Sequence, residues 1–259
     1  MSHTIPARLA LVLLLAVCHD GVALAQAPPP PSAGRQASPA TDPGADELTV
    51  PVIPERRLGE APLAPLPALP PGADRVRPLT LDVRLTTRAG GRVHTRRQTV
   101  TRAVDRVHIA AANGDEWLFE QNPVDPRRVS AAVAHHASKA IVVYSESDLR
   151  TMLGIPGWAH VLTMGVDAAT LAGATSPSAP RTMNGIAFRR LRTAALPARA
   201  VVWWNAEHLL PLEHVSADGV SSLRLAGISP VTDAARLRPL EHRFPAYRVV
   251  ELADWLEEH

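Results

Sequence analysis

The feature that most constrains the fold is a strict alternation of apolar and polar residues that begins at Leu79. In LTLDVRLTTR the apolar side chains fall at every second position: Leu79, Leu81, Val83 and Leu85. A period of two is typical of a β-strand with one buried face, because successive side chains of a strand point to opposite faces. Ala89-Gly90-Gly91 then turns the chain, and RVHTRRQTVTR returns. Residues 79–102 therefore predict a β-hairpin.

Similar patterns continue along the chain and predict an antiparallel meander. VDRVHIAA and EWLFEQ flank the tight-turn signal Asn113-Gly114, and VSAAVAHH and KAIVVYSE form a hairpin that turns near Ala137-Ser138. Further strands are predicted in MNGIAFRRLRT, AVVWWNAEH, LPLEHVSA, VSSLRLAGISPV and the start of FPAYRVVELADWLEEH, which ends in a brief helix. Because a sheet with one apolar face has to bury it, we predict a mainly β (α+β) fold. It is a curved antiparallel sheet or incomplete β-barrel covered by short helices.

Two of these short helices are predicted in the middle of the chain. Ser145 precedes an acidic first turn in SESDLRTMLG, which is typical of a helix N-cap. In PGWAHVLTM, Pro156 suits the first position of a second helix. Residues 166–182 are predicted to be a loop. We expect the two helices to lie over one opening of the curved sheet.

The N-terminus has the order of a secretory signal peptide. MSHTIPAR carries one basic residue, LALVLLLAV is a short apolar run, and Ala23-Leu24-Ala25 is a small-x-small cleavage signal. We therefore predict that residues 1–25 are removed and that the protein is periplasmic. Cys18, the only cysteine, leaves with them. In an alternative interpretation, Leu15-Ala16-Val17-Cys18 is a lipobox and Cys18 is lipidated, but Val17 is larger than the small residue expected there.

Proline-rich sequence follows from Gln26 to Pro78, with almost no aromatic residues. Such a segment buries too little apolar area to offset the entropy of ordering it, so residues 26–78 are predicted to be a disordered tether. LAPLPALPP within it leaves open a docking peptide for a partner. Residues 79–259 then form one domain. The formal net charge of +2 is well short of that of a dedicated nucleic-acid binder, and no nucleic-acid partner is expected.

Titratable residues form no recognisable catalytic or metal motif. The sequence has no G-x-S-x-G elbow, no H-E-x-x-H helix and no glycine-rich phosphate loop. His135 and His136 are neighbours in a predicted strand, so they point to opposite faces and cannot converge on one ion. Pro211 interrupts the spacing between Glu207-His208 and Glu213-His214, the other candidate pairs. We predict a protein that is not an enzyme and that has no cofactor and no metal.

Three later segments carry a resemblance to a known family: NGIAFRRLRT, VVWWNAEHLLPLEHV and FPAYRVVELADWL. Placed after an exported leader, a long meander and mid-chain helices, they resemble the LolA-like lipoprotein-carrier superfamily over residues 79–257. The resemblance implies a half-barrel domain whose apolar interior accepts acyl chains in the carriers. It implies an envelope protein that binds a lipid, a lipoprotein or another apolar ligand. The long tether and the enlarged loop at 166–182 depart from the true carrier.

Bulky apolar residues are the candidates for that interior: Trp117, Phe119, Trp158, Met164, Trp203 and Trp204. Only one of the two adjacent tryptophans can point inward. These residues either line a ligand cavity or fill the solid core of an envelope scaffold that binds no ligand. We predict that residues 146–164 are a lid over a cavity, so Trp158→Ala should cost only about 1–2 kcal/mol of stability and should reduce binding of a fluorescent fatty acid. A fully packed tryptophan costs about 3–5 kcal/mol.

Arginines of the first hairpin suggest a second contact. Arg84 and Arg88 share one face of the first predicted strand, and Arg92 and Arg96 share one face of the second. This stripe is suited to the phosphate headgroups of an anionic membrane surface. A solvated strand face in an arginine-rich chain, in which Lys139 is the single lysine, has the same appearance.

Overall fold

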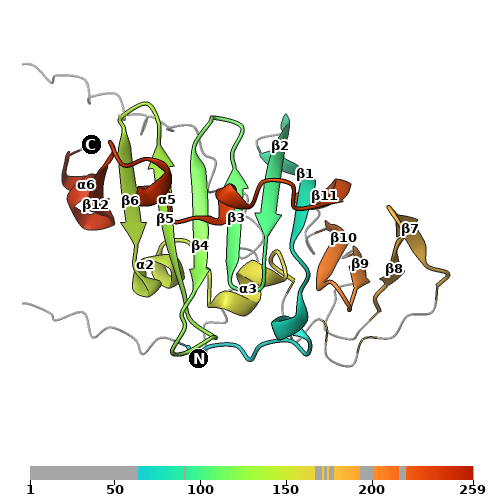
Figure 1. The fold of residues 1–259 in the computed structure, drawn as a ribbon. Helices are drawn as coiled ribbons and strands as arrows, with labels where there is room; N and C mark the ends of the chain where they lie inside the picture. Colours follow the sequence, from blue (N-terminus) through green and yellow to red (C-terminus); the bar gives the residue numbers. More distant parts are fainter. Residues whose placement is uncertain are drawn as a thin grey trace, which may run out of the picture. The chain divides into compact units, whose positions relative to one another are not determined.

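The computed structural model describes residues 64–89, 92–166, 171, 174, 178–192, 201–215 and 220–258. Within these ranges, twelve strands form one open sheet (Figure 1). Their order across the sheet is β12-β6-β5-β4-β3-β2-β1-β11-β10-β9-β8-β7. The predicted signal peptide and residues 26–63 of the predicted tether lie outside the described residues.

Two antiparallel runs make up most of the sheet. The first is the predicted meander: β1 (Leu79–Ala89), β2 (Arg92–Arg102), β3 (Arg106–Ala110), β4 (Glu116–Gln121), β5 (Val129–His135) and β6 (Ala140–Tyr144). The second is formed by β7 (Arg181–Met183), β8 (Ile186–Arg190), β9 (Val201–Asn205), β10 (Leu210–Val215) and β11 (Ser221–Pro230). β11 pairs antiparallel with β1 and joins the two runs. The predicted mainly β fold with an open antiparallel sheet is confirmed.

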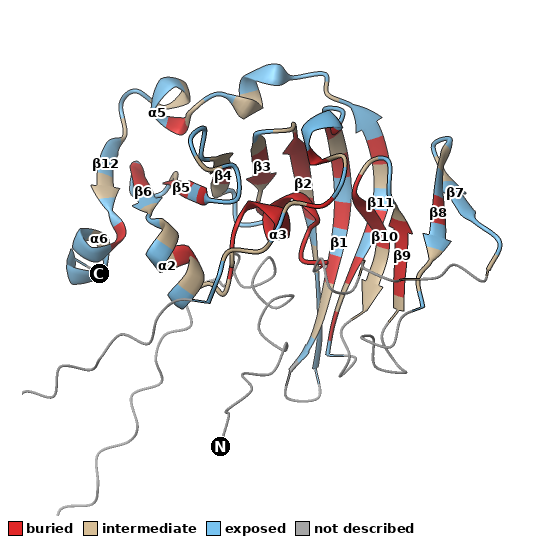
Figure 2. Ribbon diagram, turned by 90° about the horizontal axis from the view of Figure 1, so that it is seen from below, coloured by how far each residue is buried: buried red, intermediate tan, exposed pale blue. Residues whose placement is uncertain are grey.

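The last strand departs from the antiparallel pattern. β12 (Arg248–Glu251) pairs in parallel with β6, and α6 (Leu252–Glu258) follows it. A parallel neighbour requires a crossover along the sheet. Here η2 (Ala234–Leu237) and α5 (Leu240–Arg243) provide it, and they cross one face of the sheet in Figures 1 and 2. The strand and its terminal helix were predicted from the sequence, but the parallel direction was not.

The main core lies on the concave face of the sheet. Leu81, Val83 and Leu85 of β1 are at most 2% exposed, as the alternation predicts. The helix α3 (Trp158–Leu162) lies within the curve of the sheet in Figure 2 and belongs to the same core. A smaller core on the opposite, convex face joins Leu118 to Leu240 of α5.

Of the two mid-chain helices, only the first begins with the cap that the sequence predicts. α2 (Glu146–Thr151) begins with the predicted cap: the Asp148 backbone N–H donates to Ser145 Oγ, and the Ser145 backbone N–H donates to the Asp148 carboxylate. For α3, the prediction that Pro156 is the first helical residue is wrong. Gly157 is the N-cap, and a Cβ there would lie 2.6 Å from the Arg127 carbonyl oxygen. Only glycine permits this close approach.

The described end of the predicted tether packs against the domain, which corrects the predicted boundary at residue 79. Ala73, in η1 (Ala73–Arg75), and Val76 are buried in the main core, and Leu69 packs against it. Leu66 and Pro67 lie next to Gly157 at the start of α3. This stretch contains apolar side chains that find a surface on α3, and its prolines have little conformational entropy to lose. Residues 65–78 form a strap, the proline strap, over the concave core.

Candidate ligand-binding interior

An aromatic cluster on β4 forms one wall of the interior. Trp117 and Phe119 point to the concave face, and their rings stack with centroids 5.8 Å apart. Tyr144 of β6 completes the cluster, 5.2 Å from the Trp117 ring. Phe119 is fully buried and Trp117 is 4% exposed. The structure therefore brings these two predicted interior residues together.

Trp158 and Met164 come from the cover rather than from the sheet. Trp158 is the first residue of α3, it is fully buried, and its backbone N–H donates to the Arg127 carbonyl oxygen at 2.8 Å. Met164 follows α3 with a φ of 54° and is also buried. Gly165, with a φ of 85°, completes this left-handed turn. Both predicted residues close the concave face from above the sheet.

The adjacent tryptophans of β9 point to opposite faces, as expected of neighbours in a strand. Trp204 lies opposite Pro211 of β10, and Trp203 lies opposite Glu213. The guanidinium of Arg181 lies 4.0 Å from the centre of the Trp203 ring. Both indoles are buried. Trp203 therefore makes a cation–π contact with Arg181 of β7.

Arg102 is a buried cation that ties the cover to the sheet, and sequence reasoning did not single it out. Its side chain is fully buried at the end of β2. The guanidinium donates to the Leu162 carbonyl oxygen at 2.8 Å, to the Leu209 carbonyl oxygen at 3.1 Å and to the His208 carbonyl oxygen. Burial lowers the pKa of Arg102 to about 9, so it remains charged at neutral pH. It thereby joins the end of α3 to the turn between β9 and β10.

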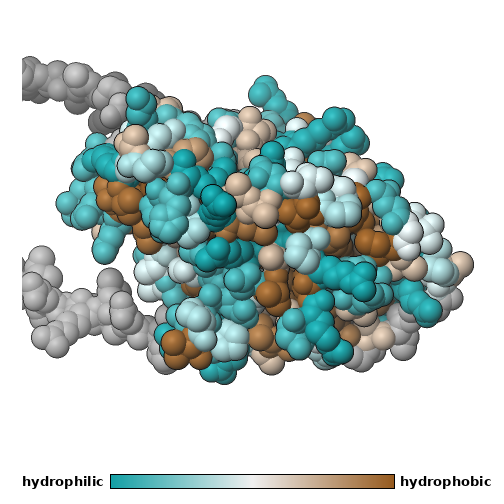
Figure 3. All heavy atoms as spheres, viewed as in Figure 1, coloured by the Kyte–Doolittle hydropathy of each residue, from teal (hydrophilic) through white to brown (hydrophobic). Residues whose placement is uncertain are grey.

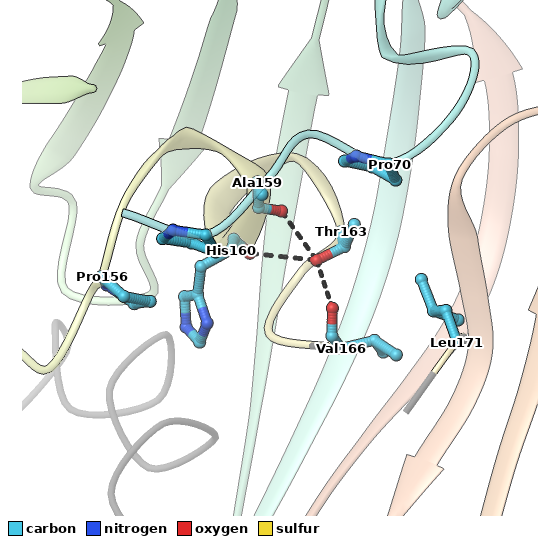
Figure 4. Close-up of a pocket in the computed structure, with 8 residues that line it drawn as sticks. Pro70, Pro156, Ala159, His160, Thr163, Val166 and Leu171 are labelled. Atoms are coloured by element: carbon cyan, nitrogen blue, oxygen red, sulfur yellow. Dashed lines mark hydrogen bonds between the residues drawn. The ribbon is translucent and has the colours of Figure 1, made fainter. Parts of the chain in front are cut away.

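Little empty space remains under the cover. A pocket of about 40 Å³ lies beside α3, and Figure 4 shows the residues that line it. They come from the strap, from α3 and from the chain beyond it: Pro67, Pro70, Pro156, Ala159, His160, Thr163, Val166 and Leu171. The Thr163 hydroxyl lies 2.6 Å from the Val166 carbonyl oxygen and 2.8 Å from that of Ala159. In this state the described interior is packed.

Two buried donors stand out in this apolar interior. The indole N–H groups of Trp117 and Trp158 are buried and have no hydrogen-bond acceptor among the described residues. Buried tryptophans usually find a partner for this group. The interior can therefore satisfy an oxygen acceptor of a bound molecule on an otherwise apolar surface.

The predicted arginine stripe is divided by the register of the first hairpin. Arg84 of β1 lies opposite Arg97 of β2, whereas Arg96 lies opposite Leu85 and shares the face of the main core. Arg84 and Arg88 therefore point to the convex face, and Arg92 and Arg96 point to the concave face. The structure does not gather these four on one surface. It places Arg97 beside Arg84 instead, and counting outwards from the turn predicted at Gly90-Gly91 would have shown this pairing.

The two adjacent histidines have separate partners: His135, the last residue of β5, is on the side of Val133, whereas His136 packs against Phe244 and Tyr247 of the smaller core. His135 Nδ1 lies 3.0 Å from the Asp115 carboxylate, and His136 Nδ1 lies 2.8 Å from the Tyr247 hydroxyl. Among the described residues, no three His, Cys, Asp or Glu side chains are grouped to hold a metal ion.

Glu116 is the most strongly bonded carboxylate of that region. Its carboxylate lies 2.7 Å from His108 Nε2 and also accepts from Arg243. Burial alone would raise the pKa of Glu116, but the hydrogen bonds from His108 and Arg243 lower it to about 2. Arg243 belongs to α5, so this cluster holds the C-terminal crossover against the sheet.

The described part of the chain is an open half-barrel with its apolar face closed by short helices and a strap. No family model and no curated protein matches its sequence. Among solved structures it is similar to a LolA superfamily protein from Nitrosomonas europaea (12% identity, 66% of this chain, 96% of that chain, TM-score 0.32). It is also similar to a DUF1329 family protein from Desulfovibrio piger (12% identity, 64% of this chain, 91% of that chain, TM-score 0.34).

A further similar structure is that of PNGF-II, at 12% identity and a TM-score of 0.37. The match covers 70% of this chain but only 33% of PNGF-II. A LolA superfamily protein, the kind of protein that the sequence resembles, is thus among the solved structures to which this chain is similar. No helix in the described ranges is both long enough and apolar enough to cross a membrane.

Proposed function

We propose that this chain is an exported, periplasmic envelope protein that binds an apolar ligand in the concave interior of its half-barrel. The ligand is the acyl chain of a lipid or of a lipoprotein, and the protein is not an enzyme. One observation carries the proposal: the concave face is apolar, and α3, a helix of five residues, is packed into its centre together with the proline strap. A cover of this size is suited to displacement.

Binding an acyl chain requires the cover to move. Ligand pockets usually have volumes of about 300–1,000 Å³, and the space beside α3 measures about 40 Å³. Two hydrogen bonds hold the ends of α3. The Trp158 backbone N–H donates to the Arg127 carbonyl oxygen at the start of the helix, and the Arg102 guanidinium donates to the Leu162 carbonyl oxygen at its end. Displacing α3 would remove Trp158 from the concave face and leave an apolar trough that an acyl chain can fill.

The unpaired indole donors favour a particular kind of apolar ligand. A pure hydrocarbon would leave the N–H groups of Trp117 and Trp158 without acceptors. An ester or carboxyl oxygen at the head of an acyl chain can accept from one of them, and a hydrogen bond of this kind contributes about 0.5–1.5 kcal/mol. Acyl esters therefore fit the interior better than alkanes do.

The packed interior also favours a second candidate, an envelope scaffold that binds no apolar ligand. In the described state Trp158 and Met164 fill the space that a ligand would need. Under this alternative α3 is a permanent part of the core.

Titration of the mature protein with cis-parinaric acid separates the two candidates. We expect saturable binding, with quenching of tryptophan fluorescence as the cover moves. Trp117→Phe keeps the aromatic ring and removes the donor, and should weaken binding by about two- to tenfold. Trp255→Phe, on α6, is the matched control and should bind the probe as the wild type does. A folded wild type that binds no probe supports the scaffold.

A further inference from the structure

Three arginines lie side by side on the convex face of the sheet. Arg84 of β1 is directly opposite Arg224 of β11 on one side and Arg97 of β2 on the other. Side chains at directly opposite positions have Cβ atoms about 4.5–5.5 Å apart. All three arginines are exposed. We call Arg224, Arg84 and Arg97 the arginine row.

The row is not neutralised within the described part of the chain. No carboxylate there forms an ion pair with any of its three guanidiniums. Glu213 lies opposite Arg224, but its carboxylate is turned to Arg181 at 3.4 Å. Asp82, the other acid nearby, is exposed and lies against Gly227 at the β-bulge of β11. Like charges directly opposite one another destabilise a sheet, so the row keeps an unfavourable arrangement in the free protein.

A hollow lies beside the row. It has a volume of about 540 Å³, and Arg84, Arg97 and Thr99 line it together with Asp82 and small side chains. Figure 3 shows the face crossed by η2 and α5. The apolar side chains on this face do not form one continuous patch, because polar side chains lie between them. The hollow lies on the opposite face from the main core, so a molecule can reach it while the cover is closed.

We propose that the arginine row binds the phosphate groups of an anionic ligand, a role that is independent of the concave interior. Neighbouring strands lie about 4.8 Å apart, so the row of three arginines extends over about 10 Å. It can hold two phosphates, or a single phosphate with an arginine on each side. A guanidinium donates two parallel hydrogen bonds to a phosphate, and Arg is therefore suited to phosphate recognition. The Thr99 hydroxyl adds a neutral donor. The bound anion removes the repulsion within the row.

Two probes distinguish a soluble phosphate ester from lipid headgroups. The first is pyrophosphate, measured by calorimetry at low salt, and the second is a phosphatidylcholine vesicle containing phosphatidylglycerol, measured by co-sedimentation. The full mature protein should bind at least one of them, and more weakly as salt is added. Binding of pyrophosphate identifies a soluble ligand, and binding of the vesicle alone identifies headgroups.

The central arginine provides the decisive variant. Arg84→Gln should reduce binding about tenfold or more, because it removes the charged donor that lies between Arg224 and Arg97. Its melting temperature should equal or exceed that of the wild type, since the substitution relieves repulsion. Arg128→Gln removes an exposed arginine that pairs with Asp125 and Glu146, and should bind as the wild type does. Unchanged binding by Arg84→Gln, no binding of either probe, or equal binding of polyglutamate would overturn the proposal.

Discussion

Replacing Arg102 by methionine should destabilise the domain, because the guanidinium donates to three backbone carbonyl oxygens, two of them in buried hydrogen bonds and one in a partly buried one. Methionine has a similar reach but no donor. The acceptors on Leu162, His208 and Leu209 would then lose this partner. At roughly 1 kcal/mol for each of the three hydrogen bonds lost, Arg102→Met should cost about 3 kcal/mol. For a domain of this size, that loss lowers the melting temperature by about 6–12 °C.

Thermal unfolding followed by circular dichroism measures this shift, and hydrogen exchange shows where it acts. The amides of α3 and of the turn between β9 and β10 should exchange faster in Arg102→Met, because the guanidinium joins these two segments. Arg128→Met is the control, since Arg128 is exposed and its loss should change the melting temperature little. Burial of a charge also has a cost that methionine would not have. An equal or higher melting temperature for Arg102→Met would show that this cost exceeds the contribution of the three hydrogen bonds.

Four further outcomes are expected. Trp158→Ala should cost about 3–5 kcal/mol in chemical denaturation, not the 1–2 kcal/mol expected of a loosely packed lid, because the side chain is fully buried; a loss below 2 kcal/mol would indicate a loose cover. Ser145→Ala should cost about 1 kcal/mol through loss of the helix cap, with Ser138→Ala as an exposed control. Glu116 has its pKa lowered to about 2, so its contribution to stability is present above the usual pKa near 4.5 and is lost as the pH falls towards 2. Glu116→Gln should therefore flatten the acid limb of the stability profile, and an unchanged limb would assign it to other carboxylates. Intact-mass measurement should find a mature chain that begins at Gln26, and a diacylglycerol-modified chain that begins at Cys18 would place the protein on a membrane instead.

Local patterns in the sequence were enough to predict much of the fold. The alternation in β1 defines its buried face, and Ser145 with its acidic turn marks the start of α2. Both depend on contacts between residues close in sequence. The direction of β12 depends instead on where a crossover of distant residues lands, and no local pattern encodes it. The strap was missed because proline-rich sequence looks alike whether or not it finds an apolar surface.

The residues of the candidate sites also divide into those that local sequence patterns identify and those that they do not. The interior aromatics were found because bulk and alternation identify them. Arg102 was missed because its partners are carbonyl oxygens of segments about 60 and 107 residues away, and these leave no mark in the sequence. Arg97 was within reach of sequence reasoning, since it follows from the hairpin register. Arg224 was not, because the pairing of β11 with β1 joins the ends of two separate runs of strands.

Native mass spectrometry of the protein purified from the cells that produce it naturally tests the central claim most directly. If the concave interior binds acyl chains, the folded protein should carry a co-purifying species with the mass of a lipid or an acylated peptide. Collisional activation should release that species, and Trp117→Phe should carry less of it than Trp255→Phe does. A folded wild-type protein found only at the mass of the bare mature chain, with no uptake of added phospholipid, would contradict the account and leave the half-barrel as a scaffold.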